Sequence, residues 1–412
     1  MRTPVSRIRP RRSVSILVSA ATLLACSRKS APTYHEDIAP ILASSCVGCH
    51  RSAGVAPVPL LETYAQVREA AGKVRRAVET RMMPPWGADN TGLCRTWKGA
   101  LALPAADIQM LTKWTESPME EGDPARARPR TPDVVPFHPS GVTLDQGVDF
   151  APGLGPSAYR CFVVDPALPR DRLLTAIRVG STEPRSVQQL TLYALDTAEA
   201  DQAASALDAG EEGPGYTCYG SSRVPAARLV TSWTWDALVL RMPEGSGVLL
   251  RGGHQLVLQA HYDPITTGID VPTRTHVDLE LEDSGQRTRE ASFLNVLPDD
   301  FALPPGRPHV EASGRLGISR PLTVLGVAPR MHSRAKTLEL ALIRTGKREC
   351  IANFDHWDFY QQRFFEYSTP FTLEPGDAVQ VSCVYDTEGR QEPTRMGEGI
   401  DDEECLASLL VH

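Results

Sequence analysis

The chain has 412 residues, with 43 Lys and Arg against 50 Asp and Glu, and its formal net charge is −7. Its first 25 residues carry five Arg and no acid, so their removal would lower the charge by five, to −12. A chain this acidic is unsuited to non-specific binding of nucleic acid, which excludes that class of partner. The length predicts two to four domains, and the 34 Pro and 31 Gly favour turn-rich β structure over long helices.

The N-terminus has the pattern of an export signal. Five Arg precede an apolar run over residues 14–25, which is too short for a membrane span. We therefore predict a signal peptide over residues 1–25. Cys26 follows Leu24 and Ala25 as in a bacterial lipobox, which predicts a lipoprotein in the bacterial cell envelope, facing the periplasm or the cell surface and anchored to the membrane by acyl chains. The alternative is an ordinary cleaved signal with an incidental cysteine.

The sequence "CVGCH" that starts at Cys46 is typical of covalent haem c attachment. In this interpretation the thiols of Cys46 and Cys49 bond to the haem, and His50 is the proximal ligand of the iron. The alternatives are a disulfide or a metal knuckle.

Helical patterns flank this motif on both sides, and a helix with aromatic residues closes the region. The three patterns lie at residues 35–46, 64–81 and 104–116. They predict a small all-α cytochrome c domain over residues 26–118.

The second axial ligand is sought in the sequence "RMMPPW". Met83 is preferred because the two prolines after it would hold the backbone extended, and Met82 is the alternate. A methionine of the apolar core is the other interpretation of Met83. Ligation by His and Met raises the reduction potential and suits electron transfer, so we expect a redox partner protein or a small reductant as partner.

Beyond residue 118 the composition changes twice. Residues 119–140 are rich in Pro and charge and predict a linker. Short alternating patterns follow, without a long helix, and predict two tandem antiparallel β-sandwich (jelly-roll) domains over residues 141–290 and 291–412. The expected strands lie at residues 159–166, 173–180, 188–195, 254–264, 275–282, 321–328, 337–344 and 378–385.

Five motifs of the β region carry a resemblance to a known family. They are "YRCFVVDP", "GPGYTCYG", "LVLQAHYDP", "PRMHSRAK" and "GEGIDDEEC". Their order resembles that of the copper type II, ascorbate-dependent monooxygenases, the family of peptidylglycine α-hydroxylating and dopamine β-monooxygenases, over about residues 150–412. The resemblance implies two jelly-roll domains with one copper each across an open cleft, and hydroxylation of a C–H bond with dioxygen. The haem would then feed electrons to the coppers.

The resemblance also implies six copper-ligand positions, of which this chain keeps two. The electron-transfer site corresponds to Gln188, Gln189 and His261, and the catalytic site to Arg330, His332 and Glu404. An amide is a weak ligand for copper and a guanidinium is none, so the positions are interpreted as vestigial and copper as doubtful.

Other histidines do not restore the sites by sequence alone. His254 lies seven residues before His261, an odd separation that places the two on opposite faces of a strand. His276, His309 and His356 are not assigned to a site.

The replaced catalytic positions lead to a specific expectation. Because Arg330 and Glu404 stand where two ligands of one metal would lie, we expect an ion pair between them with His332 beside it. The rival is that Glu404 and His332 bind a harder divalent metal such as zinc or manganese.

An exported chain permits disulfides. The resemblance implies the pairs Cys161–Cys218 and Cys383–Cys405, and it leaves Cys94 and Cys350 unassigned.

Two functions stay open. One is a haem c oxidoreductase that passes electrons to a metal-depleted monooxygenase-like module. The other is a non-enzymatic redox or binding lipoprotein that uses the sandwich pair as a docking scaffold.

Overall fold

The computed structural model describes residues 31–412 except 53, 55, 57, 129–135, 154–157, 235–238, 263–269, 284–287, 360, 361, 398 and 400. Contacts divide the chain into two units, Met1–Ala31 and Pro32–His412, and all the elements below belong to the second. The expected signal peptide and Cys26 lie outside the described residues. None of the helices in the described part of the chain combines the length and apolar character that a membrane span needs.

The N-terminal part of the second unit is helical. Its elements are η1 (Tyr34–Ile38), α1 (Ala39–Ser45), α2 (Tyr64–Glu79) and α3 (Ala105–Thr115). Thr63 and Gln66 form a capping box that fixes the start of α2. The helices enclose their own apolar cluster, in which Ile38, Leu111 and Trp114 are almost fully buried. All three expected helical segments are therefore present.

The first residues of the expected linker pack on these helices. The carbonyl of Glu120 accepts hydrogen bonds from the backbone of Tyr34 at 2.9 Å and from the indole of Trp114 at 3.1 Å. The short helix η2 (Pro124–Arg126) follows, and Arg126 pairs with Glu36 at 3.1 Å. These contacts hold residues 120–126 of the expected linker against the helices, and the linker as a whole stays a prediction.

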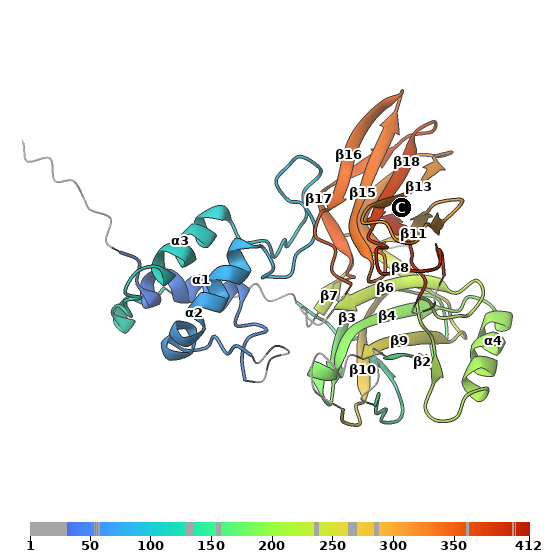
Figure 1. The fold of residues 1–412 in the computed structure, drawn as a ribbon. Coiled ribbons are helices and arrows are strands. Elements are labelled where there is room, and N and C mark those ends of the chain that lie inside the picture. The colour runs from blue at the N-terminus through green and yellow to red at the C-terminus, as the bar shows by residue number, and fades with distance from the viewer. Residues whose placement is uncertain are drawn as a thin grey trace, which may run out of the picture. The chain divides into compact units, whose positions relative to one another are not determined.

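The N-terminal β-sandwich has two sheets around a common core (Figure 1). Its first sheet has the order β5-β2-β9-β4-β6, and its second runs β1-β10-β3-β8, with β7 beside β3. The strands are β1 (Val142–Asp145), β2 (Ala158–Val164), β3 (Arg172–Ser181), β4 (Val187–Ala194), β5 (Tyr216–Thr217), β6 (Arg228–Thr234), β7 (Val239–Arg241), β8 (Ser246–Leu250), β9 (Leu256–Tyr262) and β10 (Thr275–Glu282), with the turn η3 (Pro184–Ser186) before β4.

A helix of 12 residues interrupts this sandwich, in a region where the sequence patterns predicted no long helix. It is α4 (Ala198–Ala209), capped by Thr197, whose hydroxyl accepts from the backbone of Ala200 at 3.2 Å. Ala200 and Ala204 are buried against a small cluster that also contains Tyr193. The segment is helical because it is rich in Ala, the residue with the highest helix propensity.

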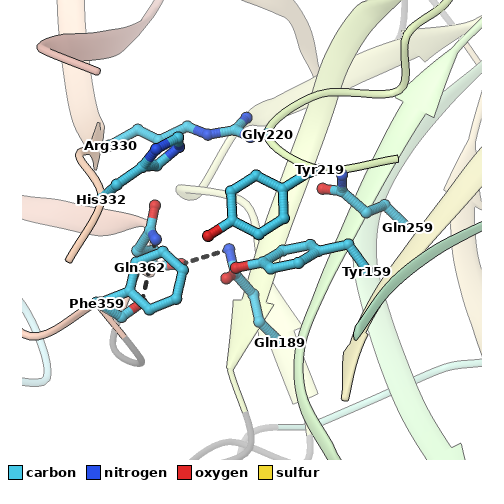
Figure 2. A pocket seen from close by; sticks show the side chains of 9 residues that line it. All are labelled: Tyr159, Gln189, Tyr219, Gly220, Gln259, Arg330, His332, Phe359 and Gln362. Carbon is cyan, nitrogen blue, oxygen red and sulfur yellow. Dashed lines mark hydrogen bonds between the residues drawn. The ribbon is translucent and has the colours of Figure 1, made fainter. Parts of the chain in front are cut away.

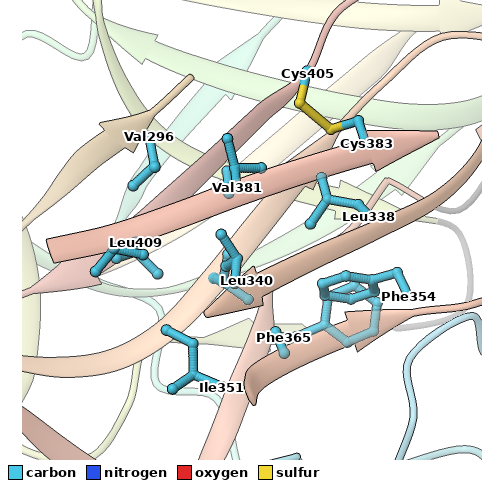
Figure 3. Packing of buried hydrophobic residues seen from close by; sticks show 14 of the residues in the cluster. Val296, Leu338, Leu340, Ile351, Phe354, Phe365, Val381, Cys383, Cys405 and Leu409 are labelled. Carbon is cyan, nitrogen blue, oxygen red and sulfur yellow. A yellow bond between two sulfur atoms is a disulfide. The ribbon is translucent and has the colours of Figure 1, made fainter. Parts of the chain in front are cut away.

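The C-terminal β-sandwich has one four-stranded sheet, β13-β18-β15-β16, facing the strands β11-β20-β14-β17. Figure 3 shows the apolar residues between them, among them Leu340, Val381 and Leu409, with the Cys383–Cys405 disulfide nearby. The strands are β11 (Arg289–Val296), β12 (Ala302–Leu303), β13 (Val310–Gly317), β14 (Leu322–Arg330), β15 (Ala335–Arg344), β16 (Lys347–Phe354), β17 (Phe365–Leu373), β18 (Ala378–Tyr385), β19 (Thr394–Arg395) and β20 (Leu406–Val411).

The two sandwiches share one sheet. The first residues of β11 pair with β8 in parallel, and its later residues pair with β20 in antiparallel register. A nine-stranded sheet therefore runs through both halves, and the division expected near residue 290 falls inside a single strand. Apart from this parallel junction, the pairing between the named strands is antiparallel, as expected for jelly-roll architecture.

Three disulfides join residues that are far apart in sequence. Two are the pairs implied by the resemblance, Cys161–Cys218 and Cys383–Cys405, with Cα atoms 5.8 and 5.9 Å apart. The third joins Cys94 to Cys350, with Cα atoms 4.9 Å apart across 256 residues of sequence. Among the described residues, Cys46 and Cys49 are the cysteines outside these pairs.

Candidate functional site

The first candidate site is the turn that carries the C-x-x-C-H motif. Helix α1 ends at Ser45, and the backbone N–H groups of Cys49 and His50 both donate to the carbonyl of Cys46, at 3.1 and 2.9 Å. This turn places two half-buried thiols and one imidazole within a single loop. Burial raises the pKa of the Cys46 thiol to about 12, and the nearby Cys49 adds to the rise. A thioether bond would remove this buried ionisable group.

The imidazole of His50 has a fixed orientation. Its Nδ1 lies 3.0 Å from the carbonyl oxygen of Pro59, so Nδ1 is the donor of this hydrogen bond, and in the neutral imidazole Nε2 would have the lone pair for a ligand bond. A metal-binding histidine characteristically donates its other ring N–H to a carbonyl or carboxylate in this way. The backbone N–H of Leu61 donates to the carbonyl of His50 at 3.0 Å, which holds the two segments together. The donor set therefore fits a haem iron.

The candidate methionines lie just after α2. The backbone N–H of Met83 donates to the carbonyl of Ala77 at 3.1 Å, so this residue remains tied to the helix end. Met82 and Met83 are 65% and 36% exposed, and Val58, beside Pro59, is 80% exposed. Both methionines are therefore accessible at the surface. The choice of Met83 over Met82 stays a prediction.

The second candidate site lies between the two sandwiches. Gln189 on β4 and His261 on β9 are direct partners across the sheet, whereas Arg330 ends β14 and His332 follows it. The structure brings residues of both halves around one small cavity, with Arg330 and His332 on one side and Tyr159 and Gln189 on the other (Figure 2). The lining residues are Tyr159, Gln189, Tyr219, Gly220, Gln259, Arg330, His332, Phe359 and Gln362.

The expected ion pair is present in this site. Arg330 Nε lies 2.8 Å from Glu404 Oε2, and His332 Nε2 lies 3.8 Å from the same oxygen. Arg330 Nη1 also donates to the hydroxyl of Tyr193 at 3.1 Å. Burial alone would lower the pKa of Arg330, but the charge of Glu404 and the contact with Tyr193 outweigh it and raise the pKa. The guanidinium is therefore a permanent cation beside the carboxylate.

Glu403, which the sequence interpretation did not single out, holds the loop that carries His332. Its carboxylate accepts from the backbone N–H groups of His332 at 2.8 Å and Arg334 at 2.6 Å. Burial raises the pKa of Glu403, and these hydrogen bonds oppose the rise. His332 Nδ1 lies 2.9 Å from the carbonyl of Asp402, which directs Nε2 toward Glu404. The acidic run "DDEEC" contains Glu403 directly before Glu404, and it was the feature of the sequence that could have pointed to this residue.

The two halves meet directly at this site. Gln189 Nε2 donates to the carbonyl of Gln362 at 3.2 Å, and the hydroxyl of Ser232 donates to the same carbonyl at 3.1 Å. The imidazole of His261 stacks on the ring of Tyr159, with ring centroids 4.1 Å apart. It also makes an edge contact with Phe359, with ring centroids 5.7 Å apart. The lining leaves room for one water molecule, a volume of about 10 Å³. The two halves therefore contact each other directly at this position, and the cavity between them is small.

The donor set of this site does not fit copper. Gln188 is buried at a β-bulge, next to Gln189. In the described residues, no group of three or more His, Cys, Asp or Glu side chains is arranged to hold a metal ion. The carboxylate of Glu404 could be a ligand for a harder metal, but it is already engaged in the ion pair with the guanidinium of Arg330. Electrostatic repulsion by this cation opposes a metal at His332, whose Nε2 lies 3.8 Å from the same Glu404 oxygen.

The other histidines have partners elsewhere in the fold. The imidazole of His276 packs over Gly180. His254 lies 2.7 Å from Asp201, His309 lies 2.9 Å from Glu311, and His356 lies 2.9 Å from Asp355.

Comparisons with known proteins agree with the family resemblance of the C-terminal half. Residues 293–411 match the family model of the copper type II ascorbate-dependent monooxygenase, C-terminal domain. This match begins within β11 and ends in β20, so it covers the C-terminal sandwich.

Curated relatives match parts of the chain at low identity. Peptidyl-glycine alpha-amidating monooxygenase A of Xenopus laevis is 24% identical over 203 residues, which is 48% of this chain and 21% of that protein. Peptidylglycine alpha-amidating monooxygenase of Rattus norvegicus is 25% identical over 48% of this chain and 20% of its own length. DBH-like monooxygenase protein 1 of Homo sapiens is 30% identical over 39% of this chain and 28% of that protein. The matched region thus spans between a fifth and less than a third of these relatives.

A solved structure of the cowpea mosaic virus top component is 12% identical and covers 66% of this chain and 86% of that one, with a TM-score of 0.23. This score is too low to inform the fold.

Proposed function

We propose that the protein is an exported haem c electron carrier whose monooxygenase-like sandwich pair has lost copper and serves as a scaffold that docks a redox partner. The observation that carries the haem assignment is the hydrogen bond from Nδ1 of His50, in the C-x-x-C-H turn, to the carbonyl of Pro59. It supports an imidazole whose Nδ1 is held by a carbonyl and whose Nε2 would face the iron.

In this proposal each residue of the motif has a distinct role. Cys46 and Cys49 hold the haem covalently, His50 is the proximal ligand and Met83 the second axial ligand, with Met82 as the alternate. The haem supplies one-electron chemistry at a potential that His/Met ligation raises. The protein itself orients His50 through Pro59.

The site between the sandwiches supports an electron carrier over a copper enzyme. An oxygen-activating copper needs imidazole or thioether ligands and space for a substrate. Here Arg330 and Glu404 neutralise each other at the catalytic position, and the cavity holds about one water molecule. The electron therefore leaves to a partner protein or a small redox molecule instead of to a copper ion in the chain. The sandwich pair supplies the docking surface for that partner.

The paired cysteines support an exported location. Six cysteines in three disulfides are typical of an exported protein, because reducing compartments keep thiols reduced. Acylation of Cys26 in the bacterial envelope is part of the proposal and rests on the sequence pattern alone.

A metal count tests the proposal. The full chain would be produced with haem c maturation in a bacterial periplasm, and iron, copper and the visible spectrum would be measured on the purified protein. We expect one covalently bound haem iron per chain and no copper after incubation with copper salts. The double variant Cys46→Ser/Cys49→Ser is the control and should carry no covalent haem.

Two results would overturn the proposal in different ways. Wild-type protein without covalent haem would remove the electron carrier. Near-stoichiometric copper would instead support a copper monooxygenase, in line with the family match of residues 293–411.

A further inference from the structure

The segment that follows the candidate axial methionine belongs to the core of the C-terminal sandwich. We call residues 84–98 the Met83 loop, because they begin directly after Met83. Within this loop Ala88 and Trp97 are 5% and 3% exposed, and both belong to the apolar cluster between the two sheets of that sandwich. The loop lies in sequence between α2 and α3, far from the strands on which it packs.

The Met83 loop pairs with one edge of each sheet. Ala88 bridges to Phe354 at the end of β16, and the backbone N–H of Asp89 donates to the carbonyl of Asn353 at 2.7 Å. Further on, Trp97 bridges to Tyr367 on β17. Strands β16 and β17 stand last in the order of their sheets, so the loop covers two edges that would otherwise expose unpaired backbone groups.

Aromatic packing fixes the two ends of this contact. Trp97 stacks on Tyr367 with ring centroids 4.5 Å apart, and its indole N–H donates to the carbonyl of Asp89 at 2.8 Å. Trp86 meets Phe365 edge-on at 5.0 Å. Such aromatic pairs contribute beyond the burial of their area, so both ends of the loop are anchored.

Covalent and ionic contacts hold the middle of the loop. Cys94 forms its disulfide with Cys350 on β16, and Arg95 Nη2 lies 2.5 Å from a carboxylate oxygen of Glu349. At the far end Lys98 Nζ lies 2.9 Å from Glu366. The sandwich thus binds the loop through backbone, apolar, ionic and covalent contacts.

From these contacts we infer that the C-terminal sandwich positions the second axial ligand of the haem, with Trp86, Gly87 and Cys94 as positioning residues. This inference rests on the proposed haem function. Met83 is held on one side by the hydrogen bond to Ala77 at the end of α2. On the other side two prolines with restricted backbone angles connect it to Trp86. A shift of the loop on the sandwich is therefore transmitted to the methionine.

Gly87 offers a sharp way to move the loop. A Cβ atom at this position would lie 2.4 Å from the carbonyl oxygen of His356, which is a backbone atom and cannot rotate away. Ala at position 87 would therefore push the start of the loop off the sandwich. A Cβ atom added to Gly72 on α2 would meet no atom within 4 Å, so Gly72→Ala is a matched control.

The test uses the full haem-bearing chain and a readout that simple destabilisation does not move. In Gly87→Ala, covalent haem and the Soret band should be retained, whereas the methionine–iron charge-transfer band should lose most of its intensity. The haem reduction potential should fall, because a weaker or absent thioether ligand stabilises the oxidised iron. Gly72→Ala should leave both quantities at their wild-type values.

A second variant guards against misfolding of the first. Cys94→Ser/Cys350→Ser keeps both backbones and removes only the covalent link. Without denaturant, this variant should retain covalent haem, and both its methionine–iron charge-transfer band and its reduction potential should be lower than in wild type. Unchanged band and potential in both variants, with limited proteolysis showing the Met83 loop released, would overturn the inference. Wild-type protein without haem would instead overturn the proposed function.

Discussion

Breaking the ion pair between Arg330 and Glu404 gives a quantitative test of the site between the sandwiches. The side chains are 21% and 10% exposed, so Glu404→Leu leaves a mostly buried guanidinium without its carboxylate. Loss of one partner of a buried pair costs about 3–5 kcal/mol. Because Arg330 keeps some solvent and the hydroxyl of Tyr193, we expect the lower end, about 3 kcal/mol of unfolding free energy.

The double variant Arg330→Met/Glu404→Leu separates the pair from its parts. Replacing both charges with apolar side chains removes the uncompensated charge, so the double variant should be about as stable as wild type, within about 1 kcal/mol. Unfolding in urea, followed by tryptophan fluorescence, measures the free energy without adding salt that would screen the pair. Glu311→Leu is the control, since Glu311 is 73% exposed and should change stability by about 0.5 kcal/mol or less.

Two results would refute this reasoning. Equal stability of Glu404→Leu and wild type would show that the pair does not form. A rise in the stability of wild type on addition of zinc, lost in Glu404→Leu, would show that Glu404 binds metal, because a ligand that binds the folded state stabilises it.

Three further predictions address the haem, the pH dependence and the metal content. Met83→Ala should abolish the methionine–iron charge-transfer band and Met82→Ala should preserve it; the reverse pattern in visible spectra would reassign the ligand. Hydrogen bonds from Arg344 lower the pKa of Asp377, so this carboxylate contributes stability above its unfolded pKa of about 3.8 that is lost as the pH falls through its folded pKa. Urea midpoints measured down to about pH 3 should therefore fall less for Asp377→Asn than for wild type. Calorimetric titration with copper(I) should give no tight binding, and a stoichiometric site would contradict the closed, ion-paired arrangement.

Local patterns predicted the three N-terminal helical segments and eight of the twenty strands named above. All eight expected strands are present, because alternation with a period of two is a property of the segment itself. Hydrophobic periodicity did not predict helix α4. Its apolar face consists of small Ala residues such as Ala200 and Ala204, which give little contrast in hydrophobicity between the faces of a helix.

The candidate site between the sandwiches was predictable only through the resemblance. Arg330 and Glu404 are far apart in sequence, and their pairing was expected because both positions correspond to ligands of one metal. The closed packing around His261 was not expected, since it depends on side chains such as Phe359 that come from the opposite half.

The position of the Met83 loop could not be predicted from the sequence. Its partners Asn353 and Tyr367 follow it by more than 250 residues, and no local pattern encodes a pairing at such a distance. The partner of Cys94 stayed open for the same reason, because connectivity cannot be deduced from cysteine spacing.

The disulfide between Cys94 and Cys350 also has a consequence for biogenesis. A chain made from its N-terminus offers the thiol of Cys94 well before its partner, which lies 256 residues later. In that interval the thiols of Cys161 and Cys218 come first, and pairing with either of them would have to be undone by exchange, which takes seconds to hours without a suitable isomerase. The yield of native protein should therefore depend on disulfide isomerase activity in the host that produces it, independently of how well haem is attached.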